Sequence, residues 1–188
     1  MVAELKKLRL FVAVALADEV RHGLAAHLGD ALAGRPLPGR PVPPDNWHIT
    51  LRFLGYATED VRDVVTAALD EAEAGGPFRL RFGGLGAFPR PARATVLWLG
   101  IEEGAERLGE VAAAVEEAVV GCGFLQEERP FHAHLTLSRI RPHQDVRPTI
   151  DRVPPFPLRQ PVTEFELFRS TLGGGPARYE PVERFPLA

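Results

Sequence analysis

The sequence predicts a fold that mixes α-helices with β-strands and is built from two similar halves. Three segments show the apolar spacing of helices, and seven shorter segments have the composition of strands. A strand, a helix, a loop and a strand follow one another over residues 8–54, and again 86 residues later over 94–140. With 188 residues, 45% of them hydrophobic and 25% charged, the chain is long enough for one domain or two small lobes.

The expected helices and strands alternate along the chain. Asp18 and Thr58 are suited to cap the first two helices, and Gly75 and Gly121 mark the ends of the second and third. The helices are expected at 18–33, 58–75 and 102–121. The strands are expected at 8–16, 47–54, 78–85, 94–101, 132–140, 162–171 and 178–185.

Two proline-rich stretches, residues 35–44 and 141–161, interrupt this order. Proline has no backbone donor and restricts the residue before it, so both stretches are expected to be loops. A loop of about 20 residues is uncommon and is often functional.

The first expected strand has to be distinguished from a signal peptide. Basic residues precede the apolar run 10–17, which ends in Ala-Leu-Ala like a cleavage site. The run has only eight residues, far fewer than a membrane span needs, and leads directly into the first helix. We therefore expect a buried strand in a cytoplasmic protein that does not associate with membranes. The single cysteine, Cys122, excludes an internal disulfide framework and a cysteine-rich zinc site.

The charge is unevenly distributed. The chain has 25 acidic and 22 basic residues, for a formal charge of −3, which argues against a protein that coats nucleic acid. Acidic residues concentrate in the three expected helices, and the remaining segments carry a net charge of +9 that comes almost entirely from arginine. The sequence therefore allows a locally basic site on the strands and loops.

One short motif occurs in both halves. His48-Ile49-Thr50-Leu51 is matched, at the same offset of 86 residues, by His134-Leu135-Thr136-Leu137. Alternate residues of a strand share a face, so each histidine and its threonine point one way while the apolar pair points into the core. If a pseudo-two-fold axis relates the halves, two imidazoles and two hydroxyls meet in one cleft.

This set of four side chains suits phosphodiester chemistry. A neutral imidazole accepts a proton from the attacking nucleophile, and an imidazolium donates a proton to the leaving oxygen; the ordinary pKa of histidine, near 6.5, serves both roles. Threonine hydroxyls donate hydrogen bonds to the non-bridging phosphoryl oxygens. No metal or other cofactor is needed, and these residues alone do not tell which histidine is the acid.

A zinc site is the main alternative for the same residues. His132 and His134 have the spacing of metal ligands, and with His48 they would form a three-histidine site. Metal ligation explains neither threonine, so we favour the metal-free scheme. The sequence leaves open a third role, in which the four side chains bind phosphate without turnover.

The sequence resembles the bacterial and archaeal RNA 2′,3′-cyclic phosphodiesterases, long called 2′-5′ RNA ligases, of the two-histidine phosphoesterase superfamily. The resemblance covers nearly the whole chain in order. It rests on Leu8–Ala13, Trp47–Gly55, Gly84–Pro89, Arg129–Arg139, Phe165–Ser170 and Tyr179–Val182.

The resemblance implies an α+β fold with two lobes, in which two pseudo-symmetric antiparallel sheets flanked by helices enclose a central cleft. Residues 1–188 would form a single bilobal domain, with lobe-forming halves near 8–90 and 91–188 that can exchange strands. It also implies metal-independent hydrolysis of a 2′,3′-cyclic phosphate to a 2′-phosphomonoester. By position, His48 is the proton donor, His134 is the proton acceptor, and Thr50 and Thr136 hold the phosphate.

Four further residues are candidates for binding the substrate. Arg52 has the same parity along its strand as His48, whereas Arg139 has the opposite parity to His134 and needs a twist or bulge to reach the cleft. The family has an arginine at the position of Arg139 that approaches the substrate. Phe11 could stack on a base or lie in the core, and His132 shares the parity of His134.

The expected partner is an RNA or oligonucleotide with a 2′,3′-cyclic phosphate end, tRNA fragments included. The reverse reaction at the same site would join such an end in a 2′-5′ linkage. We expect a monomer.

Overall fold

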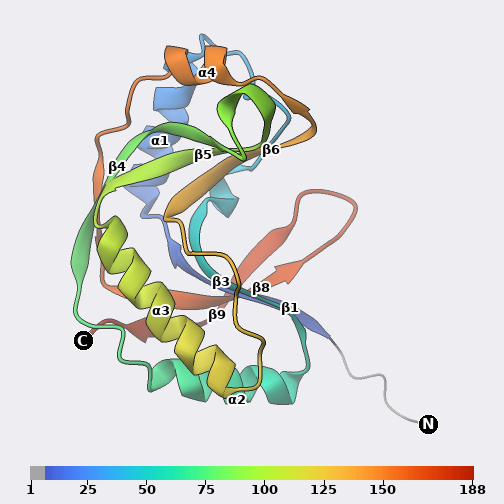
Figure 1. The fold of residues 1–188 in the computed structure, drawn as a ribbon, viewed down its shortest axis with the longest axis vertical. Helices are drawn as coiled ribbons and strands as arrows, with labels where there is room; N and C mark the ends of the chain where they lie inside the picture. Colours follow the sequence, from blue (N-terminus) through green and yellow to red (C-terminus); the bar gives the residue numbers. More distant parts are fainter. Residues whose placement is uncertain (1–6) are drawn as a thin grey trace.

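The computed structural model describes residues 7–188, which form two antiparallel sheets flanked by helices (Figure 1). One sheet has the strand order β3-β1-β8-β9 and the other the order β2-β6-β5-β4-β7. The first contains β1 (Leu8–Ala15), β3 (His48–Ala57), β8 (Glu164–Thr171) and β9 (Arg178–Pro186). The second contains β2 (Arg40–Pro41), β4 (Phe78–Phe88), β5 (Ala94–Glu103), β6 (His134–Gln144) and β7 (Arg159–Val162). The predicted α+β fold is confirmed.

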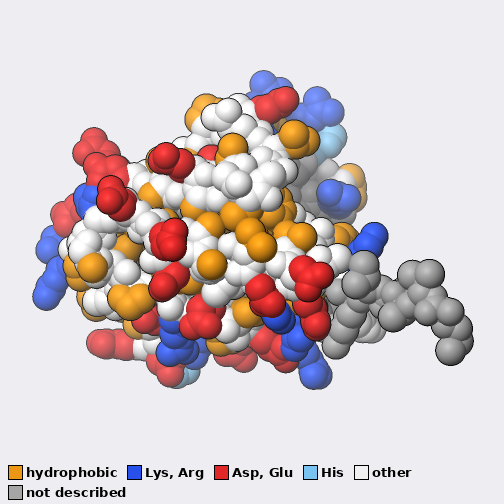
Figure 2. All heavy atoms as spheres, turned by 90° about the horizontal axis from the view of Figure 1, so that it is seen from below, with side chains coloured by type: hydrophobic (Ala, Val, Ile, Leu, Met, Phe, Trp, Pro, Cys, Tyr) orange, Lys and Arg blue, Asp and Glu red, His pale blue; other side chains and the backbone are white. Residues whose placement is uncertain are grey.

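Three long helices and one short helix cover the sheets. The helices are α1 (Asp18–Ala31), α2 (Glu59–Asp70), α3 (Ala105–Gly121) and α4 (Arg147–Arg152). Helix α3 packs against α2 and β3, on the side of the first sheet, as Figure 1 shows. Helix α1 approaches the second sheet at Gly23, where an added Cβ would lie 2.8 Å from Leu158. Helix α2 lies at the bottom of the view in Figure 1, and Figure 2, which shows the molecule from below, has many acidic side chains on that face.

The apolar faces of both sheets join in one continuous core. Its fully buried members include Ile49 and Leu135, from the two strands that carry the repeated motif. The first expected strand is β1, whose Leu10, Val12 and Val14 belong to this core. Across residues 7–188, no helix has the length and apolar character to span a membrane.

Each expected half contributes strands to both sheets. Strand β4, from the first half, pairs with β5 and β7 in the second sheet, and β8, from the second half, pairs with β1 in the first sheet. The assignment of lobes to 8–90 and 91–188 stays a prediction, and residues 1–6 lie outside the described part of the chain.

The proline-rich stretches are more ordered than expected, because their prolines stand where no backbone donor is needed. Pro41 and Pro161 lie on β2 and β7, which are edge strands, and Pro148 lies in the first turn of α4. The prediction that 35–44 and 141–161 are entirely loops is therefore wrong.

Helix ends followed the sequence signals only in part. Thr58 caps α2 as predicted, with its hydroxyl accepting a hydrogen bond from the Val61 amide at 3.4 Å. Asp18 does not cap α1; Ala17 has that place, and the Asp18 carboxylate pairs with Arg21 inside the first turn. Helix α2 ends at Asp70, several residues before Gly75.

Candidate active site

The two copies of the motif begin equivalent strands. His48 and Thr50 of β3 lie opposite Ala15 and Ala13 of β1 in the antiparallel register. His134 and Thr136 of β6 lie opposite Gly100 and Trp98 of β5. Ile49, Leu51, Leu135 and Leu137 are all buried. The apolar half of each motif therefore holds its strand in the core, and the polar half lies on the other face.

Both histidine rings are held in the same way. The Nδ1 atom of His48 lies 2.8 Å from the carbonyl oxygen of Asn46, and Nδ1 of His134 lies 2.7 Å from that of His132. A carbonyl oxygen only accepts, so each Nδ1 carries the hydrogen and donates it. Each Nε2 is left as the reactive nitrogen: a proton acceptor in the neutral ring and a donor in the imidazolium.

A β-bulge interrupts each strand at the same point of the motif. In β3, Thr50 pairs with Ala13 and Arg52 with Val12, so Leu51 has no residue opposite it. In β6, Thr136 pairs with Trp98 and Ser138 with Leu97, so Leu137 has none. An extra residue in one strand reverses the alternation of faces beyond it. The two bulges therefore decide which later side chains reach the face of the histidines.

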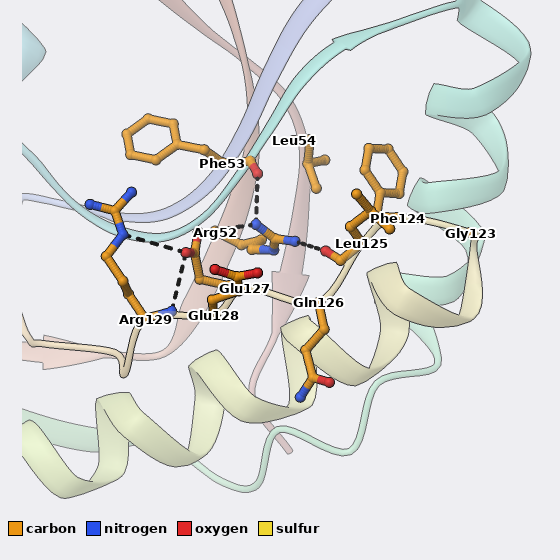
Figure 3. A pocket seen from close by; sticks show the side chains of 10 residues that line it. All are labelled: Arg52, Phe53, Leu54, Gly123, Phe124, Leu125, Gln126, Glu127, Glu128 and Arg129. Carbon is orange, nitrogen blue, oxygen red and sulfur yellow. Dashed lines mark hydrogen bonds and ion pairs between the residues drawn. The ribbon is translucent and has the colours of Figure 1, made fainter.

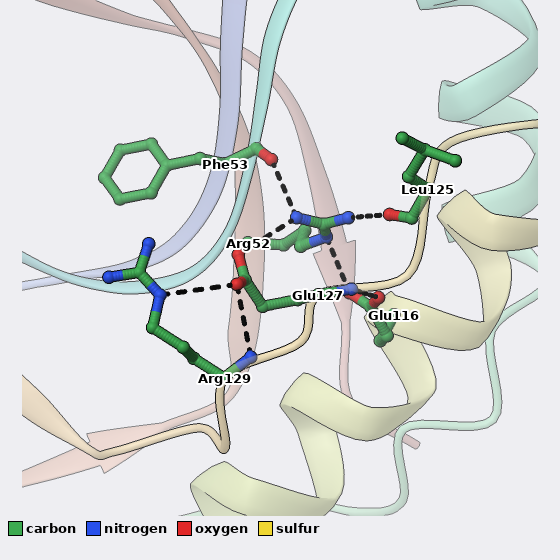
Figure 4. A network of polar contacts seen from close by, with 6 residues as sticks. All are labelled: Arg52, Phe53, Glu116, Leu125, Glu127 and Arg129. Atoms are coloured by element: carbon green, nitrogen blue, oxygen red, sulfur yellow. Dashed lines mark hydrogen bonds and ion pairs between the residues drawn. The ribbon is translucent and has the colours of Figure 1, made fainter.

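The bulge in β3 turns Arg52 away from that face. Arg52 lies opposite Val12 of the core, and its side chain is only 11% exposed. Its guanidinium pairs with Glu116 of α3 at 2.6 Å and with Glu127 at 3.5 Å, and donates to the carbonyl oxygen of Leu125 (Figure 4). The expectation that Arg52 shares a face with His48 is wrong, because simple parity ignored the bulge.

The bulge in β6 has the opposite consequence for Arg139. Arg139 lies opposite Val96, two residues from Trp98 on the same face of β5, so it reaches the face of His134 and Thr136. It lines the hollow bounded by Phe11 and Tyr179, and after burial its positive charge contributes to the lowered pKa of both His48 and His134. The structure thus supplies the bulge that the sequence required for this residue.

Aromatic rings enclose each histidine. The ring centroids of Phe11 and Tyr179 lie 4.8 Å and 5.2 Å from that of His48. Phe11 itself is only 3% exposed and stacks on Phe168, with which it forms a small buried cluster, separate from the main core, that supports the His48 ring.

The surroundings of His134 are similar but more open. Phe88 and His132 lie 5.1 Å and 5.9 Å from its ring, between centroids. His132 is exposed, and its backbone carbonyl, not its ring, holds His134. Trp98 of β5 also lies beside His132, at 5.1 Å.

Comparisons with known proteins agree with this geometry. The family model described as the 2′-5′ RNA ligase superfamily matches residues 13–174. The chain belongs to this superfamily. A relative from Escherichia coli K12 named RNA 2′,3′-cyclic phosphodiesterase is 33% identical and covers 95% of this chain and 96% of its own. A relative of the same name from Thermus thermophilus is 36% identical, and the match covers 96% of this chain and 90% of the relative.

Solved structures of 2′-5′ RNA ligase superfamily relatives have the same fold. The crystal structure of Escherichia coli LigT with 3′-AMP superimposes with a TM-score of 0.82 at 30% identity, over 97% of this chain and 99% of that one. A crystal structure of a Thermus thermophilus protein superimposes with a TM-score of 0.76 at 34% identity, over 95% of this chain and 97% of that one. The predicted family, and with it an enzyme of this class, is confirmed.

Both histidines of this superfamily member have a lowered pKa. Burial lowers the pKa of His48 to about 4, outweighing the backbone hydrogen bond to Asn46, and the charges of Arg139 and His134 lower it further. Burial is also the largest cause of the lowered pKa of His134, followed among the lowering effects by His132 and Arg139. Both rings are therefore neutral at pH 7 in the free protein.

The three-histidine zinc alternative receives no geometric support. Within residues 7–188, no three side chains of His, Cys, Asp or Glu gather closely enough to hold a metal ion.

Two hollows border β3, and Phe53 lines both. One, of about 730 Å³, lies between Arg52 and the loop 123–129; Figure 3 shows Phe53 pointing away from the Arg52 guanidinium. The other, of about 510 Å³, is lined by Phe11, Tyr179 and Arg139 among others. The histidines do not line it, but the rings of Phe11 and Tyr179, which contact the His48 ring, place this second hollow beside His48.

Sequence reasoning missed several residues around the histidines. Phe88, Trp98 and Tyr179 contact the rings from neighbouring strands, and no local pattern marks them. The sequence did hold a signal for Phe53, because the offset of 86 residues makes it the equivalent of Arg139, a candidate substrate-binding residue. Both residues lie two positions beyond the bulge, and both line the hollow beside His48.

Proposed function

We propose that the chain hydrolyses 2′,3′-cyclic phosphate ends of RNA to 2′-phosphomonoesters without a metal, using His48, Thr50, His134 and Thr136. The observation that carries this proposal is the pair of imidazoles, each held at Nδ1 by a backbone carbonyl with Nε2 free, on equivalent strands. Two such nitrogens supply the acid and the base that the displacement requires. The names of the relatives support the same reaction.

In the proposed step, His134 Nε2 takes a proton from water as the water oxygen bonds to phosphorus. The bond from phosphorus to the ribose 3′ oxygen breaks, and His48 Nε2 donates its proton to that oxygen. The products are a 2′-phosphomonoester and a 3′-hydroxyl, and solvent returns the proton from His134 to His48. The hydroxyls of Thr50 and Thr136 donate to the non-bridging oxygens, and Arg139 offsets their negative charge.

Because the pKa of His48 is low, the substrate itself has to promote the protonation of this histidine. As the proton donor, His48 must be charged, but its burial favours the neutral ring. A phosphate anion between the two histidines raises the pKa of both, because an opposite charge stabilises the imidazolium. Substrate binding therefore favours the protonated form of His48 that the reaction needs.

The donor and acceptor can be told apart with a substrate whose leaving atom needs no proton. We expect His48→Ala to regain much of its lost rate on a cyclic phosphate with sulfur in place of the 3′ oxygen, because a thiolate leaves unprotonated. His134→Ala should gain little. Rescue of His134→Ala instead would reverse the two roles.

One assay separates this function from its alternatives. The protein is incubated with a defined RNA ending in a 2′,3′-cyclic phosphate, with and without EDTA, and the products are analysed. We expect a 2′-phosphate in both samples. Loss of turnover in EDTA would indicate a metallohydrolase, and binding without product would indicate a module that only holds RNA ends.

The remaining expectations belong to the same proposal. The RNA substrates include tRNA fragments, the protein acts as a cytoplasmic monomer in a single bilobal domain, and the same site joins ends in a 2′-5′ linkage. Ligation is not the reverse of hydrolysis, as the sequence analysis expected, but the same displacement with a 5′-hydroxyl in place of water: His134 takes the proton of that hydroxyl, the bond from phosphorus to the 3′ oxygen breaks, and His48 donates its proton to the 3′ oxygen. Incubating a cyclic-phosphate end with a 5′-hydroxyl RNA at high concentration tests it.

A further inference from the structure

The hollow of about 510 Å³ beside His48 is lined by none of the four side chains of the proposed mechanism; it borders them through Phe11 and Tyr179, whose rings contact His48. Its lining includes three arginines, Arg9, Arg40 and Arg139, and the aromatic side chains of Phe53 and Tyr179. No aspartate or glutamate from the described residues lines it. A concave surface with this composition suits a ligand that is both anionic and aromatic.

The arginines are placed unfavourably for the protein alone. Arg40 of β2 and Arg139 of β6 lie directly opposite each other in the antiparallel register. Like charges at directly opposite positions destabilise a strand pair. Within residues 7–188, neither these two arginines nor Arg9 forms an ion pair with a carboxylate. An anion bound between them would relieve the repulsion.

Phe53 adds an aromatic surface to the same place. It lies opposite Phe11 in the register, on the face of the histidines, and is 53% exposed. Such a large apolar side chain contributes little to the core from this position. A ring with one free face beside arginines is the arrangement with which proteins stack the bases of single-stranded RNA.

We propose that this hollow is a second nucleotide subsite, which binds the residue preceding the cyclic phosphate. Phe53 stacks on the base of that residue, and Arg9 and Arg40 hold the phosphodiester that joins it to the terminal nucleotide. The inference rests on the proposed function and narrows it: the preferred substrate is an oligonucleotide end, not a cyclic mononucleotide.

The test compares two substrates that differ by one nucleotide. We measure kcat/KM for adenosine 2′,3′-cyclic phosphate and for the dinucleotide ApA with the same cyclic end. We expect the dinucleotide to be favoured by about 10-fold or more, since stacking one base on an aromatic ring is worth about 1–3 kcal/mol. Equal values for the two substrates would overturn the proposal.

Variants of the hollow's lining residues test whether these residues cause the preference for the dinucleotide. We expect Phe53→Ala and Phe53→Leu to remove most of it and Phe53→Tyr to keep it, because tyrosine retains the aromatic face. Arg40→Ala should lower the ratio of the two kcat/KM values and flatten the salt dependence for the dinucleotide, by about 0.7 in the log–log slope for one lost phosphate contact. The matched control is Arg62→Ala on α2, which removes an arginine far from the hollow and should change neither quantity.

A binding measurement keeps this inference separate from the proposed function. Calorimetry compares adenosine 2′-phosphate with the dinucleotide ApA carrying a 2′-phosphate end, on the wild type and on Phe53→Ala. We expect the dinucleotide to bind more tightly to the wild type and to lose that advantage in the variant, even if neither cyclic substrate is turned over. Turnover of both cyclic substrates with no such difference in binding would leave the proposed function standing and refute the second subsite.

Discussion

Strands β3 and β6 share a motif and a bulge, and they differ in the residues beyond the bulge. There, β3 sends Arg52 toward α3 and Phe53 toward the hollow, whereas β6 buries Ser138 and sends Arg139 to the hollow. Equivalent positions thus present an aromatic ring in one strand and a positive charge in the other. The repeated motif supplies the two histidines and two threonines of the proposed mechanism, and the residues that differ beyond the bulges, Phe53 and Arg139, each line the hollow.

The histidines themselves also differ. His48 is packed between Phe11 and Tyr179, and burial lowers its pKa to about 4; His134 lies beside the exposed His132, and burial, followed by the charges of His132 and Arg139, lowers its pKa. Two rings with the same hydrogen-bond pattern therefore have different neighbours, and different neighbours are what allow two like groups to take acid and base roles.

The largest expected effect on activity comes from removing either histidine of the repeated motif. We expect His48→Ala and His134→Ala each to lower kcat on a cyclic-phosphate RNA by at least about 10²-fold, because each removes one proton transfer. The matched control is His22→Ala, an exposed histidine on α1 that should retain the wild-type rate. A near-wild-type rate in either active-site variant would refute the mechanism.

The two threonines come next. We expect Thr50→Val and Thr136→Val to lower kcat by about 10- to 100-fold each, because a methyl group replaces a hydroxyl that donates to the phosphoryl oxygens. Thr66→Val on α2 controls for the loss of a hydroxyl elsewhere. If the threonines only bind the ground state, KM rises and kcat stays constant.

These comparisons also show how far the sequence could lead. The repeated motif and its offset predicted the paired strands, because the period of two and the apolar residues between are local properties. The bulges at Leu51 and Leu137 could not be read from the same pattern, since they depend on how the neighbouring strands pair. Arg52 was misplaced for that reason, and the rings of Tyr179 and Phe88 come from strands distant in the sequence.

Arg52 and Arg139 should differ in what their loss affects. Arg52→Ala leaves the half-buried Glu116 without its arginine, leaves Glu127 with Arg129 alone, and removes the link between β3 and the loop at Leu125, so we expect a loss of about 2 kcal/mol in the free energy of unfolding. Arg139→Ala should leave that free energy within about 0.5 kcal/mol of the wild type, because Arg139 is exposed. Urea unfolding of both variants measures the difference; equal losses would contradict the placement of the two arginines on opposite faces.

The smallest expected effect is electrostatic. Arg139 lowers the pKa of both histidines, so Arg139→Ala should raise both values, that of His48 from about 4 toward the ordinary value. One imidazole must be neutral and the other charged, so the pH profile of kcat/KM is bell-shaped, with an optimum below pH 6.5 in the wild type because both pKa values are lowered. Both limbs should move to higher pH in Arg139→Ala and stay in place in Arg62→Ala. Titration of the imidazole resonances by NMR measures the same shift without turnover, and an unchanged His48 pKa would show that Arg139 lies too far from the ring to act on it.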